Sequence, residues 1–345
     1  MCEARRQRRG LAGLLVLLID ARLVLGSLLL AFAFDALVGD PGWLWRRVPH
    51  PVVAMGRAIT RLEKRCLDGA APPADQARWG QIASLLVIVA TTLVAFAVQA
   101  LCQVAPLGWL LLAFAMSTLI AARGLHDHVA AVAAGLEQGL AEGRQAIAHI
   151  VGRDPASLDT HGVARAAIES SAENFADGVV APLFWGALFG LPGIAAYKAI
   201  NTLDSMIGHR SPRYVHFGRF GARLDDFANW LPARLSAFLI LAASLFLPGT
   251  KPVEGWRALR RDARRHRSPN AGWPEAAMAG CLGLKLAGPR SYAGQLVDDA
   301  WMGEGRAGAT PTDIRRALRV YVLACGALAV VLVLALSVVS GRIAS

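Results

Sequence analysis

Charged residues are scarce in this chain. They make up 18% of its 345 residues, against roughly 25% in ordinary soluble domains. Hydrophobic residues make up 55%, and the mean hydropathy is +0.42, which excludes a soluble globular protein and indicates an integral membrane protein. Aromatic residues make up 7% and are not interleaved with the basic residues, so the net charge of +11 does not indicate nucleic-acid binding. Twelve Lys and Arg lie between Lys251 and Arg316, which favours a cytoplasmic loop facing anionic lipids and ligands.

Cysteine is also rare, and the familiar nucleotide motif is missing. The five cysteines form no Cys-x-x-Cys pair and no Cys/His metal spacing, so they indicate neither a disulfide framework nor a zinc site. The sequence Gly-x-x-x-x-Gly-Lys-Ser/Thr does not occur. A nucleotide bound by this chain is therefore not held by a Walker-type loop.

What the chain has instead is a set of long apolar runs. Four of them approach the roughly 20 residues that cross a bilayer core, at 11–34, 82–104, 106–122 and 318–339. Two further segments are interrupted, 179–200 by prolines and glycines and 231–248 by Pro232 and Arg234 at its entry. Such segments are tolerated at membrane depth where they are buried in protein or line a cavity. We expect that these two do not both cross simply, because otherwise the polar loops could not all face the cytoplasm.

These runs predict an all-α polytopic membrane protein with about 4–6 membrane-embedded segments and amphipathic helices in the connecting loops. We expect one membrane-embedded domain over 1–345, with a basic extension and the start of the first membrane helix at 1–27 and a C-terminal membrane helix at 318–339. The arginines at the N-terminus precede a run too long for a cleaved signal and are expected to anchor or orient it. Residues 35–52 predict a rigid non-helical turn, and we expect helix to resume at Met55. Residues 121–165 predict two amphipathic helices interrupted at 153–155, and residues 256–267 predict a basic helix.

Four polar clusters stand out against this apolar background. The richest has carboxylates at Glu169, Glu173 and Asp177, a spacing that puts all three on one face of a helix. Like charges at this spacing repel, so either a cation compensates them or they form a solvated acidic face. The clusters are Asp35, Asp40 and His50; Glu169, Glu173, Asn174 and Asp177; Lys198, Asn201, Thr202, Asp204, Ser205 and His209; and Arg223, Asp225, Asp226, Asn229 and Arg234.

Carboxylate and amide oxygens are hard ligands suited to Mg²⁺ held together with substrate phosphates. Polar groups at membrane depth are expensive, so their presence between Lys198 and Asp204 favours a function. The clusters together predict a site for a phosphate-bearing substrate and a divalent cation.

Taken in order, these motifs resemble the adenosylcobinamide-phosphate synthase family of cobalamin biosynthesis, an integral membrane family. The resemblance covers roughly residues 28–294 and leaves out the N-terminal extension. The matching motifs are Asp35-Ala-Leu-Val-Gly-Asp-Pro41, Pro49-His-Pro-Val52, Glu169-Ser-Ser-Ala-Glu-Asn174, Asp177-Gly-Val-Val-Ala-Pro182, Tyr197-Lys-Ala-Ile-Asn-Thr-Leu-Asp-Ser-Met-Ile-Gly208, Phe217-Gly218, Ala222-Arg-Leu-Asp-Asp226, Pro232-Ala-Arg234 and Ser268-Pro-Asn-Ala-Gly-Trp-Pro-Glu275.

The resemblance implies ATP-dependent amide formation between adenosylcobyric acid and (R)-1-amino-2-propanol or its O-phosphate, with ATP and Mg²⁺ as cofactors. It also implies a multi-pass protein of the cell membrane, with the lipid bilayer and other corrinoid-pathway enzymes as partners. By hypothesis, the candidate residues are catalytic His50, Lys198, Asp204 and Arg223; substrate- or nucleotide-binding Asp40, Asn174, Asn201, Thr202, Arg234 and Asn270; and metal-binding Glu169, Glu173, Asp177, Asp225 and Asp226.

Two other functions compete with this one. Asp177-Gly178 and the Asp225-Asp226 pair are also typical of Mg²⁺-dependent lipid alcohol phosphotransferases and prenyltransferases, but the rest of those motifs is missing. A transporter would place an ion or substrate site at the broken segment around Pro192, and would show inverted repeats, which we do not find.

Overall fold

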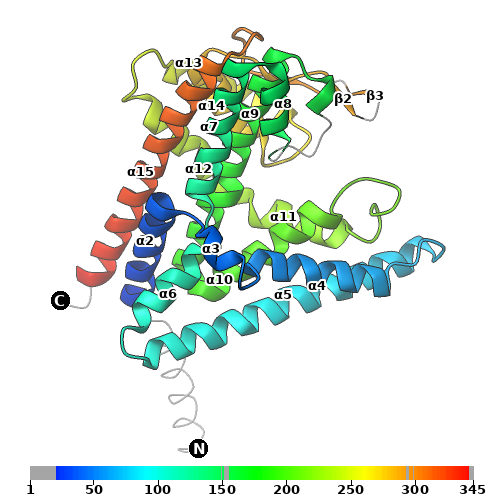
Figure 1. Ribbon diagram of the computed structural model, residues 1–345, viewed down its shortest axis with the longest axis vertical. Helices are drawn as coiled ribbons and strands as arrows, with labels where there is room; N and C mark the ends of the chain where they lie inside the picture. The colour runs from blue at the N-terminus through cyan, green and yellow to red at the C-terminus, as the bar shows by residue number, and fades with distance from the viewer. Residues whose placement is uncertain (1–20, 149, 151–154, 293–294, 298, 342–345) are drawn as a thin grey trace, which may run out of the picture. The chain divides into compact units, whose positions relative to one another are not determined.

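The computed structural model describes the chain except for residues 1–20, 149, 151–154, 293–294, 298 and 342–345. The described part is almost entirely helical (Figure 1). Its helices are α2 (Ala21–Val38), α3 (Gly42–Trp45), α4 (Pro51–Cys66), α5 (Pro73–Val104), α6 (Gly108–Ser117), α7 (Ala122–Gln138), α8 (Leu140–Ile147), η1 (Pro155–Ser157), α9 (Thr160–Phe175), the π-helix η2 (Ala176–Val180), α10 (Ala181–Ile207), α11 (Arg219–Ala228), α12 (Trp230–Ser244), α13 (Pro252–Asp262), η3 (Ala263–Arg265), α14 (Gly272–Leu282) and α15 (Pro311–Gly341).

Four short strands form two small antiparallel pairs that the sequence did not suggest. Strand β1 (Leu286–Ala287) pairs with β4 (Trp301–Met302), with Leu286 opposite Met302. Strand β2 (Arg290–Tyr292) pairs with β3 (Gln295–Val297). The predicted helical membrane fold is confirmed, with these pairs as a local addition.

Among the described residues, five helical stretches are long and apolar enough to cross a membrane, and a sixth results if the bent pair α11 and α12 counts as one span. The predicted spans at 82–104 and 318–339 are confirmed, as parts of α5 and α15. The run at 106–122 becomes α6 and continues into α7, and the first span is described from Ala21. The N-terminal arginines and residues 11–20 lie outside the described residues. The five stretches are Ala21–Val38, Pro73–Val104, Gly108–Gln138, Thr160–Ile207 and Pro311–Gly341.

The chain forms two compact units. Unit 1 comprises Met1–Ile120, Pro182–Asp225 and Val330–Ser345, and unit 2 comprises Ala121–Ala181 and Asp226–Ala329. In unit 1, α2 packs against α6, where Phe34 meets the edge of Phe114, and α4 packs against α5. In unit 2, α9 is buried along most of its length and packs against α7, α14 and η2. The prediction of a single membrane-embedded domain stays a prediction.

The broken apolar segment at 179–200 is confirmed as an interrupted helix. Within α10, Gly190 adopts a φ of 66° and a ψ of −152°, a left-handed conformation that favours glycine, and Pro192 follows. The break frees backbone groups, and the N–H of Leu191 donates to Oε1 of Gln99 on α5 at 2.8 Å. A side chain of another membrane helix thus replaces the lost helical acceptor.

Three local predictions are wrong in part. The segment 35–52 is not wholly non-helical: α2 continues through Val38, a short helix α3 follows, and α4 begins at Pro51, four residues before the predicted Met55. Proline fits the first turn of a helix because its missing N–H would have no partner there, so Pro51 starts α4. Within 121–165, helices α7 and α8 are separated at Gly139 by a break that was not predicted, and residues 153–154 of the predicted interruption lie outside the described residues. The basic helix predicted at 256–267 begins at Pro252 and ends in the 3₁₀ turn η3.

Asp262 ties the end of α13 to a distant part of unit 2. Its carboxylate accepts hydrogen bonds from Arg261 at 2.6 Å and from the backbone N–H of Gly303 at 2.9 Å. Burial raises the pKa of Asp262, but the hydrogen bonds from Arg261 and Gly303 outweigh it and bring the pKa below the ordinary value. The ionised carboxylate is therefore the form that stabilises the fold.

Asp262→Asn is expected to reduce the free energy of unfolding by about 1–3 kcal/mol at neutral pH. Because the folded-state pKa is depressed, this stabilisation is present above the unfolded-state pKa of about 3.9 and is lost as the pH falls through the folded-state value. The difference in thermal midpoint between wild type and variant, followed by tryptophan fluorescence, should therefore shrink in acid. Glu254→Gln, an exposed pair partner of Arg257 on the same helix, is the matched control and should have little effect. A difference that persists unchanged to the lowest pH would contradict this account.

Candidate functional site

In unit 1, the C-terminal half of α10 carries the third polar cluster. Lys198, Asn201 and Asp204 are spaced three residues apart on this helix and are half-buried, so they share one face as predicted. The hydroxyl groups of Thr202 and Ser205 donate to the carbonyls of Lys198 and Asn201, four residues earlier in each case. The helix ends at Ile207, and the exposed His209 follows it.

Helix α11 adds a second set of groups to this face. Asp225 is 8% exposed and accepts a hydrogen bond from Nδ2 of Asn201 at 3.4 Å, while Arg223 is exposed. This hydrogen bond brings one residue of the third cluster, Asn201, together with one residue of the fourth, Asp225. The result is a carboxylate held by an amide, with a lysine and an arginine on the two helices that carry them.

His50 caps the helix that it precedes. Its Nδ1 accepts a hydrogen bond from the N–H of Val52 at 3.2 Å, and its Nε2 lies 3.5 Å from Oδ1 of Asp40. Since Nδ1 acts as the acceptor, the proton of a neutral ring resides on Nε2 and faces the Asp40 carboxylate. Asp35, from the same predicted cluster, is buried in the last turn of α2. This arrangement suits His50 to holding Asp40 in place better than to accepting a proton.

Replacing His50 separates the capping role from chemistry. His50→Ala is expected to lower the free energy of unfolding by about 1 kcal/mol because α4 loses its cap, whereas His50→Asn should retain most of it because Asn caps helices well. Thermal unfolding of both variants measures this difference. If both variants also lose activity equally, the imidazole itself contributes to the reaction; if only the alanine variant does, its role is positional.

In unit 2, the three predicted carboxylates have different environments. Glu169 is 6% exposed and accepts the backbone N–H of Ala287 at 2.9 Å, Glu173 is exposed, and Asp177 is half-buried. Helix α9 gives way to the π-helix η2 at Ala176, so Asp177 lies on a π-helical segment and not on α9 itself. The alternative of a solvated acidic face is wrong for Glu169, whose side chain is buried. Short π-helical segments occur frequently at functional sites.

The side-chain amide of Asn174, in the same cluster, is hydrogen-bonded within its own helix, α9. Nδ2 of Asn174, which is exposed, donates to the carbonyl of Ser170 at 2.9 Å and to its hydroxyl at 3.1 Å. The amide is thereby oriented, and its carbonyl oxygen has no part in either bond. Glu173, Asn174 and Asp177 therefore present oxygen donors around the α9–η2 junction.

A second group in unit 2 centres on Arg234. Its guanidinium lies between two indole rings, 4.2 Å from the centroid of Trp230 and 4.3 Å from that of Trp273. It donates to Oδ1 of Asn270 at 3.4 Å, and Nδ2 of Asn270 donates to the carbonyl of Asp226 at 2.8 Å. Asn229 lies at the bend of 44° between α11 and α12. Three of the predicted residues, Asp226, Arg234 and Asn270, are thus brought together.

A magnesium ion is the metal implied by the resemblance. Among the residues that the structure describes, no three His, Cys, Asp or Glu side chains approach closely enough to hold a metal by themselves. Mg²⁺ bound with a nucleotide needs only one or two carboxylates, since phosphates and water supply the other oxygens. The accessible carboxylates Glu173 and Asp177 fit that smaller donor set; Glu169 is already engaged with Ala287.

Two features of the site were missed in the sequence. The spacing of Trp230 and Arg234, four residues apart, is a readable signal for stacking on a helix, but Trp273 comes from another element and carries no such signal. The cap formed by His50 was hidden because His is an uncommon capping residue.

The comparisons with known proteins agree in one family. A family model described as CobD/Cbib protein matches residues 28–321. Among the relatives, a protein of Rhizobium meliloti (strain 1021) named "Cobalamin biosynthesis protein CobD" is 48% identical over 306 residues, which is 88% of this chain and 94% of the relative. A protein of the same name from a Sinorhizobium species is 50% identical, over 89% of this chain and 96% of the relative. Another from Rhodobacter capsulatus is 46% identical, over 85% of this chain and 91% of the relative. No solved structure matches the chain.

Proposed function

The chain belongs to the CobD/Cbib protein family and has a role in cobalamin biosynthesis, and from this premise we propose that it is an ATP-dependent amide ligase. Its substrates are adenosylcobyric acid and (R)-1-amino-2-propanol or its O-phosphate, and its product is adenosylcobinamide or the corresponding phosphate. The single observation that supports this reaction best is the polar face of α10 and α11, where Lys198, Asn201, Asp204, Arg223 and Asp225 combine cations and carboxylates at the end of an interrupted apolar helix.

The reaction has two steps. A carboxylate oxygen of the corrinoid attacks the γ-phosphorus of ATP, which gives an acyl phosphate and releases ADP. The amine nitrogen then attacks the acyl carbon, the bond from that carbon to the phosphate oxygen breaks, and inorganic phosphate leaves while the nitrogen loses a proton. Both steps move negative charge onto phosphate oxygens, so fixed cations that face those oxygens accelerate them.

The residues of unit 1 have distinct tasks in this proposal. Lys198 and Arg223 neutralise the phosphate oxygens as charge develops. Asn201 orients the carboxylate of Asp225 through their hydrogen bond. Asp204, half-buried one turn further along α10, accepts a hydrogen bond from the incoming amine and keeps it beside the activated carboxyl. His50 holds Asp40 for contact with the substrate.

The residues of unit 2 supply oxygen ligands for a metal ion and the guanidinium group of Arg234. Bound Mg²⁺ would neutralise the phosphates of ATP, and Glu173 and Asp177 are the residues suited to hold it. The planar guanidinium of Arg234 lies between two indole rings, which suits it to pairing with a phosphate or carboxylate in a fixed orientation. Asn270 fixes the other edge of that arginine.

The test uses the full chain purified in detergent, incubated with adenosylcobyric acid, aminopropanol phosphate, ATP and Mg²⁺, and follows the corrinoid by mass spectrometry. We expect a mass gain equal to the new amide, dependent on ATP and lost in Asp204→Asn. Parallel incubations with free aminopropanol identify the preferred amine. An unchanged corrinoid mass with folded protein would overturn the ligase proposal.

The transporter alternative makes a different prediction about ATP. A ligase releases ADP in proportion to amide formed and needs the amine to do so, whereas a transporter releases no ADP in response to added amine. Measuring ADP against amine concentration therefore separates the two functions. We propose the cell membrane as the location, with the polar loops facing the cytoplasm that supplies ATP.

A further inference from the structure

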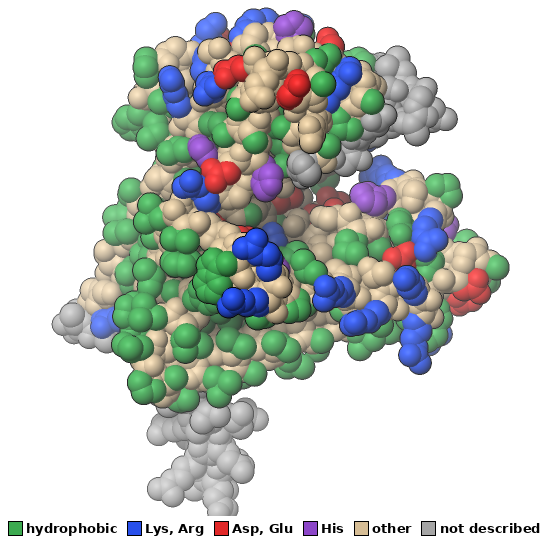
Figure 2. Space-filling model, viewed as in Figure 1, with side chains coloured by type: hydrophobic (Ala, Val, Ile, Leu, Met, Phe, Trp, Pro, Cys, Tyr) green, Lys and Arg blue, Asp and Glu red, His purple; other side chains and the backbone are tan. Residues whose placement is uncertain are grey.

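The surface of α4 carries cations without compensating acids. Its basic residues Arg57, Arg61, Lys64 and Arg65 are all exposed. The one acid of this helix, Glu63, is 9% exposed and accepts hydrogen bonds from Arg213 at 2.8 Å and from the hydroxyl of Tyr214 at 2.8 Å. The exposed face of α4 is therefore positive from Arg57 to Arg65. Figure 2 shows Lys and Arg side chains gathered over the part of unit 1 where Figure 1 places this helix.

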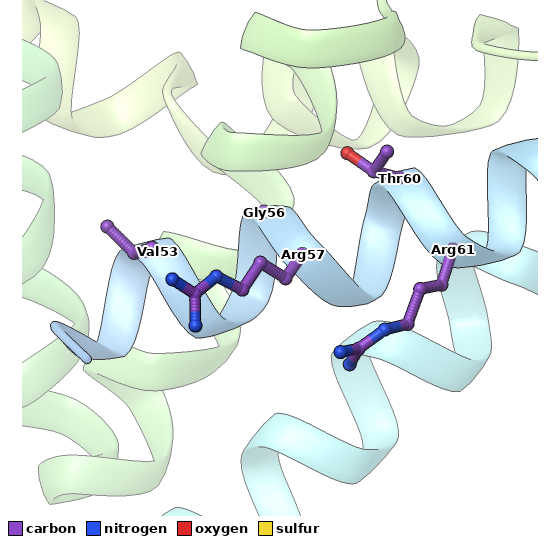
Figure 3. Close-up of a pocket in the computed structure, with 5 residues that line it drawn as sticks. All are labelled: Val53, Gly56, Arg57, Thr60 and Arg61. Atoms are coloured by element: carbon purple, nitrogen blue, oxygen red, sulfur yellow. The ribbon is translucent and has the colours of Figure 1, made fainter. Parts of the chain in front are cut away.

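Part of this face is a pocket. It has a volume of about 450 Å³, within the roughly 300–1,000 Å³ typical of small-ligand sites, and is lined by Val53, Gly56, Arg57, Thr60 and Arg61. In Figure 3 the Arg57 side chain runs back along the helix toward Val53, and the Arg61 side chain projects on the same side, whereas Thr60 projects on the other. The charged groups that reach the pocket are thus two guanidinium groups, one helical turn apart.

Neither guanidinium group has a partner. In the described part of the chain, Arg57 and Arg61 make no hydrogen bond and lie in no ion pair. Other arginines of this protein do have such partners: Arg213 is bound by Glu63 and Arg261 by Asp262 and Glu304. Two cations one turn apart repel, and an anion that bridges them removes the repulsion and gains charge-assisted hydrogen bonds.

The pocket also offers an apolar contact beside its two cations. Val53, which lines it, is 47% exposed. Helix α4 also packs against α5, a candidate membrane span whose side chains Leu85 and Leu86 are exposed by 42% and 55%. Inorganic phosphate would gain nothing from these apolar groups, whereas an amphiphile with an anionic head would use both features.

We propose that the α4 pocket binds the headgroup of an anionic phospholipid, with Arg57 and Arg61 on its phosphate and Val53 against the start of its acyl region. This proposal does not depend on the reaction proposed above. It fixes α4 at the level of the lipid headgroups, on the leaflet that carries anionic lipid.

Native mass spectrometry of the full chain in neutral detergent tests this site, with phosphatidylglycerol and phosphatidylcholine as probes. We expect phosphatidylglycerol to be retained preferentially. Arg57→Gln/Arg61→Gln should lower its apparent affinity roughly 30-fold and leave that of phosphatidylcholine unchanged. The matched control Lys64→Gln/Arg65→Gln removes the same charge from the same helix outside the pocket, and should change the affinity less than about threefold. Circular dichroism establishes that each variant is folded.

Three results would overturn the proposal. Equal losses in the two double variants would mean that charge attracts lipid without a site. Displacement of the lipid by glycerol 3-phosphate, which has a phosphate ester but no acyl chains, would assign the pocket to a free phosphate ester. Displacement by ATP would assign it to the nucleotide. If Arg57→Gln/Arg61→Gln does not fold, Arg57→Lys/Arg61→Lys keeps the charge but not the planar fork, and an affinity unchanged from wild type would likewise exclude the specific contacts proposed.

Discussion

Replacing Glu173 by Gln is expected to lower the rate of amide formation at least about 100-fold without unfolding the protein. Glu173 is exposed at the end of α9, one turn before the π-helix that carries Asp177, and the substitution changes charge while keeping shape. If its carboxylate holds the Mg²⁺ that accompanies ATP, the variant will need a higher Mg²⁺ concentration for half-maximal rate. The measurement is the initial rate of amide formation as a function of Mg²⁺, at saturating substrates.

Glu142→Gln is the matched control for this variant. Glu142 is also an exposed carboxylate of unit 2, on α8, and loses the same charge. It should leave both the maximal rate and the Mg²⁺ dependence unchanged. If Glu173→Gln lowers the rate but leaves the Mg²⁺ dependence as in wild type, the carboxylate acts on a substrate and not on the metal. A variant with full activity would remove Glu173 from the site.

Gly80→Ala is expected to lower the free energy of unfolding by more than about 3 kcal/mol. A Cβ at position 80 would lie 1.9 Å from the backbone oxygen of Phe217, where both partners are main chain and neither can rotate away. Phe217 is buried in the segment between α10 and α11, so displacing it would also disturb the hydrogen bond from Asn201 to Asp225. Thermal unfolding in detergent measures the stability, and the corrinoid assay measures the consequence for the site.

The control is the same substitution on another helix of unit 1. A Cβ at Gly26 on α2 would meet nothing within 4 Å, so Gly26→Ala should leave the thermal midpoint unchanged or raise it, because alanine is the better helix former by about 1 kcal/mol. A midpoint of Gly80→Ala equal to that of wild type would mean that α5 can move away from Phe217 at no cost.

The helical membrane fold was predictable because it depends on composition over long windows. Apolar runs of sufficient length gave α5 and α15, and the proline and glycine content of 179–200 gave an interrupted segment. The position of the break was harder to predict, because Pro192 and several glycines are all candidates. The glycine that adopts a positive φ is Gly190, and the break there is accompanied by the hydrogen bond from Leu191 to Gln99, which is distant in the sequence.

The helical spacing of the candidate residues was predictable from the sequence, but their contacts were not. The spacing of Lys198, Asn201 and Asp204 on one helical face could be read directly, since it follows from helix geometry. The hydrogen bond from the backbone N–H of Ala287 to Glu169, 118 residues earlier, could not be predicted from the sequence. The change from α-helix to π-helix at Ala176 could not be predicted either. Both are decided by packing between segments, which a local pattern does not contain.

The hydrogen bond between Gln99 and Leu191 also sets an order of biogenesis. The two residues are 92 positions apart, and α5 leaves the ribosome well before α10. Until α5 is in the bilayer, the second half of α10 would enter the lipid with an unsatisfied N–H at its start, which costs several kcal/mol. The earlier helix therefore acts as an internal template for the later one, and the face that carries Lys198 and Asp204 is completed only when that template is already inserted.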